Sequence, residues 1–253
     1  MQATHHSPPQ WPPGTTVVQI ATYNESASIS SLITAIHTAV PHAHILVIDD
    51  NSPDGTAQIV AEKADKNERV HLLLRTDRRG LGTATLEGIQ WAQKRAAEVI
   101  VHLDGDFSHN PADIPRLIAA LAILDEMPFD IAIGSRKVPG GTATGWSVKR
   151  HIISWLVCWF TRVVLRVPVR DGSSGFRALR IRCIESINLE NLASGYAFFE
   201  DFLWRAHQSG ARMTEIPITF TNRKLGESKA SGIEMLRGAR DLVRLAVHTW
   251  FKC

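Results

Sequence analysis

The sequence predicts an α/β fold in which a mostly parallel sheet carries helices on both faces. Short, continuous runs of β-branched and other apolar residues recur along the chain, a pattern typical of strands that are buried on both sides. These runs alternate with stretches of helical periodicity, which indicates crossovers between parallel strands. In such sheets ligands bind beyond the carboxyl ends of the strands. Polar residues directly after each apolar run are therefore candidate site residues.

The first half of the chain contains the regular part of this alternation. Each apolar run is followed by a stretch with apolar residues at helical spacing, and turn-forming residues separate the two. We expect strands over residues 16–21, 44–48, 70–74, 99–103 and 131–133, and helices over residues 28–40, 56–66, 83–95 and 114–124.

The second half is less regular, and it ends in a further helix. Residues 233–251 have apolar side chains at helical spacing and arginines on another face, which predicts an amphipathic helix. We therefore divide the chain into a flexible, Pro-rich N-terminal arm (1–14), one α/β domain (15–230) and a C-terminal amphipathic helix (231–253). Within the domain we also expect helices over residues 146–166 and 198–208 and strands over residues 176–179 and 213–220.

The composition is that of a globular protein. The 253 residues are 44% hydrophobic and 21% charged, which argues against wholesale disorder. The net charge of +3 is too small to predict nucleic-acid binding. The basic residues gather from Arg136 onward, which suits an anionic partner such as a pyrophosphate or a lipid surface. Three widely spaced cysteines without a Cys-x-x-Cys pair indicate reduced thiols in the cytoplasm.

The sequence predicts membrane contact without a membrane span. No apolar stretch approaches the roughly 20 residues that a span requires, and the N-terminus lacks the apolar run of a signal peptide. Two segments combine aromatic with cationic residues, which suits helices that lie at a bilayer surface: residues 152–167 and the end of the chain at Trp250, Phe251 and Lys252. We expect a peripheral protein on the cytosolic face. Packing against the core, a homo-oligomer or a membrane-anchored partner subunit are the alternatives.

Two carboxylates, Asp104 and Asp106, directly follow the apolar run at residues 99–103 and are separated only by Gly105. At the end of a buried strand they would repel each other unless a cation lay nearby. Their hard oxygen ligands suit Mg²⁺ or Mn²⁺, which also bridge pyrophosphate oxygens. The pair therefore predicts a divalent-cation site that neutralises charge on a nucleoside-diphosphate leaving group. We interpret His109 as a turn residue and His102 as a hydrogen-bonded core histidine.

Further polar residues follow the first two strands. The first strand leads into Thr22-Tyr23-Asn24-Glu25, and the second leads into Asp49-Asp50 and a turn over residues 51–55. Turn formation and helix capping explain residues 51–54 equally well. A carboxylate at Asp50 is suited to hydrogen-bond the ribose or base of a nucleoside.

Basic residues also follow predicted strands or begin helices. They include Arg136 after the strand at 131–133, Arg150 at the start of a helix, and the segment 222–229 with Arg223 and Lys229. A substrate rich in phosphate needs such counter-charges. The segment 78–82, Arg-Arg-Gly-Leu-Gly, could approach an anion through its backbone N–H groups.

Taken together, these motifs resemble those of the inverting family 2 glycosyltransferases, and in particular the polyprenol (dolichyl) phosphate mannosyltransferases. The resemblance extends from Thr16 to about Lys229. It implies a GT-A fold built on a Rossmann-like sheet. The motifs that carry it are residues 22–25, 47–56, 80–82, 104–109, 134–136, 173–177 and 223–229.

The resemblance also implies roles for individual residues. Catalysis is assigned to Asp104, Asp106 and Arg223, and the metal, Mg²⁺ or Mn²⁺, to Asp104, Asp106 and Ser108. The phosphate of the acceptor is assigned to Ser135, Arg136 and Arg150. The nucleotide-sugar is assigned to Ala21, Tyr23, Glu25, Ile48, Asp50, Asp104, Gly105, Asp106, Arg136, Arg223 and Lys229.

Three positions depart from the pattern of the family. Ala21 stands where relatives usually have proline, Ser108 where many have glutamine, and Asn222 where aspartate is frequent. The first change is expected to loosen the nucleoside wall. The second is expected to weaken the metal contact or to leave it mediated by water.

The resemblance implies that GDP-mannose donates mannose to a polyprenyl phosphate lipid. An acceptor phosphate oxygen attacks the anomeric carbon and inverts it. No strong general base is needed, because a phosphate monoester is already ionised near neutral pH, so catalysis depends on positioning and charge stabilisation. The alternatives are glucose or another sugar from a UDP donor, or a catalytically silent nucleotide-binding scaffold. A nucleotidyltransferase fits less well, because no Gly-rich phosphate loop follows the first strand.

Overall fold

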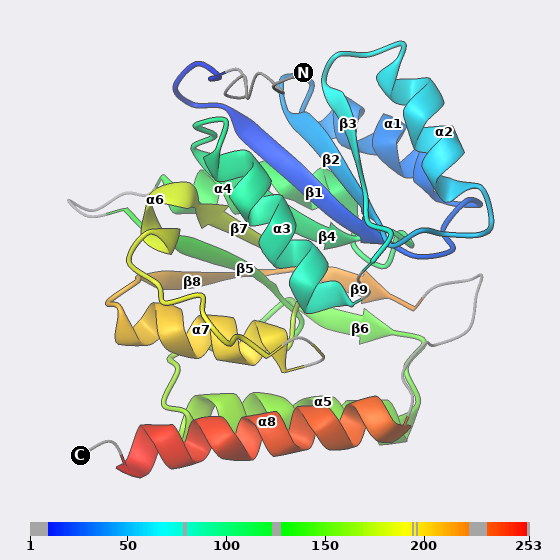
Figure 1. The fold of residues 1–253 in the computed structure, drawn as a ribbon. Coiled ribbons are helices and arrows are strands. Elements are labelled where there is room, and N and C mark those ends of the chain that lie inside the picture. Colours follow the sequence, from blue (N-terminus) through cyan, green and yellow to red (C-terminus); the bar gives the residue numbers. More distant parts are fainter. Residues whose placement is uncertain are drawn as a thin grey trace.

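The computed structural model describes residues 10–77, 80–122, 128–193, 195, 197–222 and 232–251, without the side chains of 232–237 and 251. Its main sheet has the strand order β3-β2-β1-β4-β7-β5-β8 (Figure 1). Only β7 is antiparallel to its neighbours, so the prediction of a mostly parallel sheet is confirmed. The strands are β1 (Thr16–Thr22), β2 (His44–Asp49), β3 (Val70–Leu74), β4 (Val99–Asp104), β5 (Ile131–Ser135), β7 (Arg177–Arg180) and β8 (Met213–Pro217).

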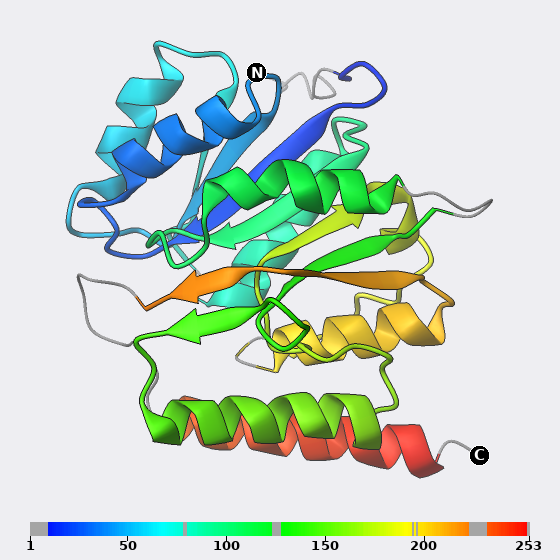
Figure 2. The same ribbon diagram turned by 180° about the vertical axis from the view of Figure 1, so that it is seen from behind.

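Helices cover both faces of this sheet, as the continuous apolar runs predicted. One face packs against α1 (Ile29–Ala39), α2 (Thr56–Ala64), the 3₁₀ turn η1 (Pro111–Asp113) and α4 (Ile114–Leu121). The other face packs against α3 (Leu81–Gln93), α6 (Ile181–Ile184) and α7 (Phe198–Gln208). Figures 1 and 2 show these two layers from opposite sides. Each face has its own buried apolar cluster, and the sheet separates them.

A small second sheet extends the molecule beyond β8. It consists of β6 (Thr142–Thr144) and β9 (Thr219–Thr221), which pair in parallel. The sequence predicted one strand over residues 213–220, and this was wrong: the chain leaves the main sheet after Pro217. Proline has no N–H with which to continue the ladder, and the N–H of Ile218 instead donates to the carbonyl of Ser135.

Two long helices form a separate layer on one side of the molecule, and we call them the helical layer. They are α5 (Val148–Trp159), which continues into the π-helix η2 (Phe160–Val164), and α8 (Gly232–Phe251). They lie side by side in both views (Figures 1 and 2). Trp250 Nε1 donates to the carbonyl of Val164 at 2.9 Å, and the guanidinium of Arg166 lies 4.1 Å from the Trp250 ring. Within the described residues, neither helix is long and apolar enough to cross a membrane.

The N-terminal segment contacts the domain through Trp11. The Trp11 ring stacks on His44 at 3.9 Å, and the backbone N–H of Trp11 donates to the carbonyl of Arg95. Within the described part of the predicted arm, Trp11 is therefore packed against the domain, while Pro12, Pro13 and Gly14 are exposed. The large apolar area of the Trp11 ring favours this contact.

Candidate active site

The residues that follow the first, second and fourth strands lie together at one edge of the sheet. Ala21 of β1 is the register partner of Ile48 on β2 and of Asp104 on β4. These three residues form one row across neighbouring strands. The strands β2 and β3 lie on one side of β1 and β4 lies on the other, so the order in which strands are added to the sheet reverses between β1 and β4. Such a switch point is where α/β sheets bind ligands.

The turn after β4 positions both carboxylates. Phe107 has a left-handed backbone with a φ of 59°, and the N–H of Ser108 donates to Asp106 Oδ1 at 3.0 Å. The N–H of Asp104 donates to His109 Nδ1 at 3.3 Å, and the Asp104 side chain is 37% exposed. Burial lowers the pKa of His109 to about 3, so the ring is neutral. His109 thus supports the turn, as its place in the sequence predicted.

Gly105 lies in close contact with the loop after β1. A Cβ atom at this position would lie 3.2 Å from Thr22 Cγ2 and 3.4 Å from Glu25 Cγ. The hydroxyl of Ser28 donates to the Gly105 carbonyl at 2.8 Å. The absence of a side chain between the two aspartates therefore lets the β4 turn pack against the β1 loop.

The two aspartates fit a cation that also binds the substrate. Their oxygens are the hard ligands that Mg²⁺ and Mn²⁺ take. In the described part of the chain, no group of three or more His, Cys, Asp or Glu side chains forms a complete metal cage. A cation held here would thus take further ligands from water and from a diphosphate, as Mg²⁺ commonly does. The third predicted ligand, Ser108, is buried, and its carbonyl accepts from the N–H of Thr221.

Two loops, after β1 and after β2, pack against each other beside the row. The N–H of Glu25 donates to Thr56 Oγ1 at 3.0 Å, and the N–H of Asn24 donates to Ser52 Oγ at 2.9 Å. These bonds hold the β1 loop, with half-buried Tyr23, against the turn after β2. Within the turn itself, the N–H of Ser52 donates to Asp49 Oδ2 and the N–H of Thr56 donates to Asp54 Oδ1, but the N-cap of α2 is Gly55, which provides no side-chain cap.

Asp50 is held by an arginine that the sequence did not single out. Arg75 Nη1 donates to Asp50 Oδ1 at 2.6 Å, and the N–H of Gly80 donates to Oδ2 at 2.8 Å. Arg75 is 5% exposed, and its Nε lies 3.3 Å from Glu87 Oε2, an ion pair without hydrogen-bond geometry. Burial raises the pKa of Asp50, while Gly80 and Arg75 oppose that shift. Asp50 thus connects the β2 turn to the start of α3.

Arg136 forms the most buried ion pair near the site. Its Nε and Nη2 donate to the two oxygens of Asp171 at 2.8 and 2.6 Å, and its backbone N–H donates to the same carboxylate at 2.8 Å. The side chains are 7% and 0% exposed. Burial alone would raise the pKa of Asp171, but the hydrogen bonds and charge of Arg136 lower it. Asp171 therefore fixes the orientation of a guanidinium that the sequence predicted to bind phosphate.

Arg150 contacts the same two aromatic rings as Arg136. It is an exposed residue of α5, and its Nη1 donates to Asn222 Oδ1 at 2.9 Å. Arg136 and Arg150 both lie against the rings of Trp146 and Phe220. The structure thus brings two of the three residues predicted for the acceptor phosphate into one cluster.

The remaining predicted residues are not in that cluster or lie outside the described residues. Ser135 is fully buried, and its Oγ accepts from the N–H of Lys137, so its role toward the acceptor phosphate stays a prediction. Ser135 supports the turn that carries Arg136. Arg223, Lys229, Arg78 and Arg79 lie outside the described residues.

The core histidine His102 also differs from its prediction. It is buried beside Phe199, and neither ring nitrogen has a hydrogen-bond partner among the described residues. Burial lowers its pKa to about 4, so the ring is neutral. His102 is therefore a core residue without the expected hydrogen bond.

Arg177 and Glu200 are two ionisable residues buried beneath the site. Arg177 donates to the carbonyls of Gly172, Ser174 and Phe199, while Glu200 Oε2 has no partner among the described residues. Gly175, in the same segment, is so close to the β4 turn that a Cβ there would lie 3.6 Å from Asp104 Oδ1. The predicted motif at residues 173–177 thus supports the site from below.

Replacing Glu200 by glutamine should change how stability depends on pH. Burial raises the pKa of Glu200 from 4.5 to about 7, so the folded protein holds this proton more tightly than the unfolded chain. The stability of the parent should therefore fall between about pH 4.5 and 7 relative to Glu200→Gln, by roughly 3 kcal/mol, and stay constant above. Urea unfolding of both proteins from pH 5 to 8 measures this difference. A difference that does not vary with pH would contradict it.

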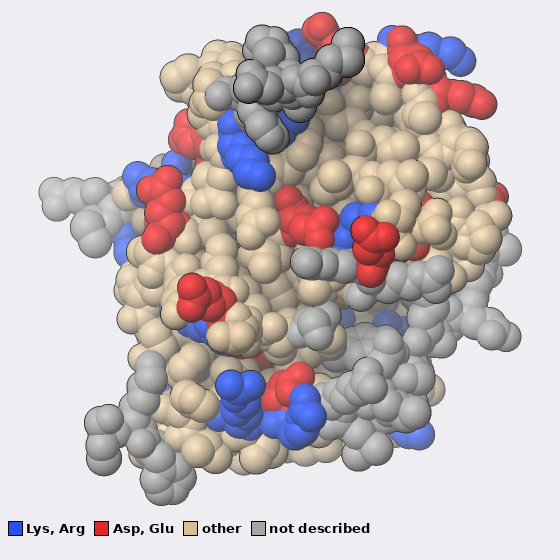
Figure 3. All heavy atoms as spheres, viewed as in Figure 1, with Lys and Arg blue, Asp and Glu red and all other residues tan. Residues whose placement is uncertain are grey.

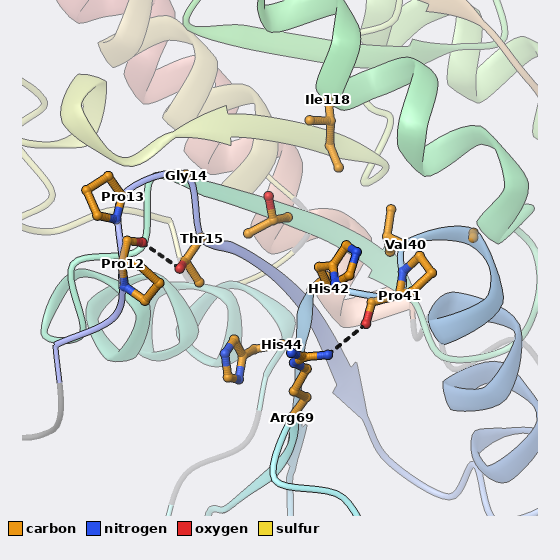
Figure 4. A pocket seen from close by; sticks show the side chains of 13 residues that line it. Pro12, Pro13, Gly14, Thr15, Val40, Pro41, His42, His44, Arg69 and Ile118 are labelled. Atoms are coloured by element: carbon orange, nitrogen blue, oxygen red, sulfur yellow. Dashed lines mark hydrogen bonds between the residues drawn. The ribbon is translucent and has the colours of Figure 1, made fainter.

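A hollow at the other edge of the sheet is not this site. It has a volume of about 510 Å³ and lies at the amino-terminal ends of β1 and β2, between Pro12, His42 and Arg69 (Figure 4). Its only titratable side chains are His42, His44 and Arg69. It thus lacks the carboxylates that a metal-assisted transfer requires.

The comparison with known proteins agrees with this geometry. The sequence profile described as "Glycosyl transferase family 2" matches residues 17–187. The chain belongs to this family. Among curated members of glycosyl transferase family 2, it is 42% identical over 86% of its length to the polyprenol monophosphomannose synthase of Mycolicibacterium smegmatis, covering 81% of that protein. It is 40% identical over 84% of its length to the undecaprenyl-phosphate mannosyltransferase of Micrococcus luteus, covering 86% of that protein.

Solved structures support the fold of this family 2 glycosyltransferase. The glucosyl-3-phosphoglycerate synthase of Mycobacterium tuberculosis, in complex with Mn²⁺, UDP and phosphoglyceric acid, matches 94% of the chain with a TM-score of 0.68. The match covers 78% of that chain at 17% identity. A complex of the same synthase with Mg²⁺ and UDP gives a TM-score of 0.66 at 16% identity. At this identity the likeness concerns the fold, and it confirms the predicted GT-A architecture.

Proposed function

We propose that this family 2 glycosyltransferase transfers mannose from GDP-mannose to a polyprenyl phosphate, with inversion at the anomeric carbon. The observation that carries the proposal is the 40–42% identity, over more than four fifths of the chain, to two enzymes named for mannose and a polyprenyl acceptor. The arrangement of carboxylates and arginines around the edge of the sheet supports it.

The donor would lie along the row at the carboxyl ends of the strands. Of the residues predicted for the nucleoside, Ala21, Tyr23 and Glu25 are partly exposed at this edge and would contact it. Ile48 is fully buried, and Asp50 is buried and bonded to Arg75 and Gly80, so these two would support the nucleoside site from beneath. The diphosphate would lie at Asp104 and Asp106, next to β1. A Mg²⁺ or Mn²⁺ ion held by these two carboxylates would neutralise the charge of the leaving diphosphate.

The acceptor phosphate would lie at Arg136 and Arg150. A phosphate monoester brings its own ionised oxygen, so the reaction requires orientation of the nucleophile rather than a proton acceptor. His109 is neutral and fully engaged in the core, which agrees with a mechanism that uses no histidine base. The guanidinium groups would hold the phosphate while the side chains at β4 hold the leaving group.

The helical layer provides a surface that suits a bilayer. Its cationic residues include Arg162, Arg166, Arg240 and Arg244, and in Figure 3 Lys and Arg side chains lie over α8. Apolar side chains beside cations are typical of helices at a membrane interface. Because α5 carries both Arg150 and this apolar face, a lipid that leaves the bilayer here would have its phosphate close to the site. The exposed apolar residues are Val148, Ile152, Ile153, Trp155, Leu156, Trp159, Val163, Val243, Val247 and Trp250.

Removing two of these side chains should weaken membrane binding. Trp155 and Trp159 are 58% and 47% exposed, and we expect Trp155→Ala with Trp159→Ala to lower the affinity for anionic vesicles about tenfold or more. Co-sedimentation with phosphatidylglycerol vesicles measures this. Leu74→Ala, which removes a 48% exposed apolar residue at β3, is the control. Unchanged vesicle binding together with loss of a dimer in sedimentation velocity would assign the layer to a second subunit.

The donor and acceptor are tested by one assay. The purified full chain is incubated with polyprenyl phosphate, Mg²⁺ or Mn²⁺ and, in turn, GDP-mannose, UDP-glucose and other UDP-sugars. We expect glycolipid formation from GDP-mannose only and a β-linked product from an α-linked donor. Turnover with UDP-glucose but none with GDP-mannose would replace the proposed sugar, and nucleotide binding without any transfer would identify a silent scaffold.

A further inference from the structure

The ring of Trp146 contacts both arginines proposed for the acceptor phosphate. The guanidinium carbon of Arg136 is 4.9 Å from the ring centroid, and that of Arg150 is 4.5 Å away. Phe220 contacts Trp146 edge-on at 5.5 Å and lies 5.5 Å from Arg136 and 5.6 Å from Arg150. One aromatic pair therefore contacts both guanidinium groups.

The four residues come from three separate parts of the chain. Arg136 follows β5, Trp146 and Arg150 lie four residues apart at the start of α5, and Phe220 lies in β9. The contact between Trp146 and Arg150 is local, but the contacts with Arg136 and Phe220 do not arise from local sequence. The complete set forms only when the small sheet, the main sheet and the helical layer are in place together.

The two arginines are held in different ways. Arg136 is fixed by the bidentate bond to Asp171. Arg150 is exposed and bonds to the Asn222 side chain, whose own amide donates to the carbonyl of Gly145 next to Trp146. The indole ring is thus a surface that the exposed Arg150 and the buried Arg136 both contact. The negative face of an aromatic ring also reduces the cost of bringing two cations together.

The same aromatic pair contacts the catalytic turn. Phe220 lies 5.2 Å from the His109 ring, and His109 accepts the N–H of Asp104. The N–H of Thr221, the next residue, donates to the carbonyl of Ser108. The acceptor cluster and the carboxylate turn therefore share packed neighbours, so a displaced ring at Trp146 would move an arginine relative to Asp104.

Packing alone does not explain every feature of Trp146. Its Nε1 is buried and has no hydrogen-bond partner among the described residues. Burying such a donor is unfavourable, and a phenylalanine would fill apolar space without that cost. The π face, which is larger and more electron-rich in indole than in phenyl, is the property that favours tryptophan here.

We propose that Trp146 is a positioning residue for the acceptor: its ring holds Arg136 and Arg150 in the relative orientation that binds the phosphate of the acceptor lipid. This inference rests on the proposed function, because it assigns the two arginines to the acceptor rather than to the donor. It predicts that changes at Trp146 act on the acceptor and leave the donor unaffected.

The test uses the full chain and three variants, Trp146→Phe, Trp146→Leu and the control Trp91→Leu. Trp91 also carries an arginine on its ring, with Arg95 at 3.8 Å, but it lies in α3, away from the acceptor cluster. KM and kcat are measured separately for GDP-mannose and for a short-chain, water-soluble prenyl phosphate, so that membrane binding does not contribute. Thermal unfolding of each protein is recorded in parallel.

We expect Trp146→Leu to raise the KM for the prenyl phosphate about tenfold or more. This is the loss of affinity expected when the cation–π contacts of both arginines are removed. Trp146→Phe should raise it only about threefold, because a phenyl face is retained. The KM for GDP-mannose should stay within about twofold in both, and Trp91→Leu should change neither KM, whatever it does to stability.

The outcomes are distinguishable. If the parent does not transfer sugar to the prenyl phosphate at all, the proposed function fails. If the parent is active but both Trp146 variants keep the acceptor KM of the parent, or raise donor and acceptor KM equally, the inference about Trp146 is overturned. If Trp146→Leu does not fold, Trp146→Phe tests the inference in the same way: its KM for the prenyl phosphate should rise while its KM for GDP-mannose stays unchanged.

Discussion

Replacing Asp104 by asparagine is expected to lower sugar transfer by about 10³-fold or more, equivalent to roughly 4 kcal/mol in the activation barrier. The change keeps the size of the side chain and removes the charge that would hold a divalent cation beside the leaving diphosphate. The Asp104 side chain is partly exposed at the end of β4, so the cost in stability should be small. Initial rates at saturating GDP-mannose and acceptor measure the loss.

The control for this variant is Asp65→Asn, the same chemical change at an exposed position after α2. It should keep the full rate, and both variants should unfold within about 2 °C of the parent. Titration with Mn²⁺ in the presence of GDP should show weaker binding for Asp104→Asn only. An Asp104→Asn protein that keeps the rate of the parent would remove Asp104 from the mechanism.

Replacing Asp171 by alanine is expected to destabilise the fold by about 3–5 kcal/mol, because it leaves the buried guanidinium of Arg136 without its carboxylate. For a chain of this length the midpoint of thermal unfolding should fall by about 10 °C. Changing both partners, Asp171→Ala with Arg136→Met, should recover most of that loss, since no unpaired charge then remains buried. Urea unfolding of the parent, both single variants and the double variant gives the coupling energy.

The pH dependence of this effect has a definite sign. The pKa of Asp171 is lowered in the folded protein, so its stabilising contribution is present above the unfolded pKa of 3.8 and is lost as the pH falls through the folded pKa. The difference between the parent and Asp171→Ala should therefore be constant from pH 5 to 8 and shrink below about pH 4. Arg116→Ala, which breaks the exposed pair with Asp113, should cost about 1 kcal/mol or less. If Asp171→Ala lowered the free energy of unfolding by no more than Arg116→Ala does, the stabilising role of the buried pair between Asp171 and Arg136 would be contradicted.

The sequence predicted the parts of the fold that depend on local patterns. The helix expected over residues 198–208 has those limits in the structure, because its apolar face and its charged residues alternate at helical spacing. The strands that lead to the site each extend one residue further than expected, to Thr22, Asp49 and Asp104. The last residue of each strand is polar, so the run of apolar residues ends one position before the backbone pairing does.

The parts that could not be predicted depend on contacts between distant segments. Asp171 lies 35 residues from Arg136 in an irregular stretch without periodicity, so no pattern connects them. Arg75 follows a strand like several surface arginines, and only the folded chain shows it buried against Asp50. The break at Pro217 did have a local signal, since proline rarely continues a strand. Trp146, in contrast, meets Arg136 only through the tertiary fold, although Arg150 is four residues away in the sequence.

The row formed by Ile48, Ala21 and Asp104 fixes a length inside the enzyme. Neighbouring strands lie about 4.8 Å apart, so the two ends of the row, on β2 and β4, are separated by roughly 10 Å. That separation belongs to the backbone of three hydrogen-bonded strands, and exchanging loop residues cannot alter it. Any donor that places its base near Ile48 and its phosphates near Asp104 must match this span. Engineering a different donor is therefore a matter of changing the side chains at either end, while the reach between them stays constant.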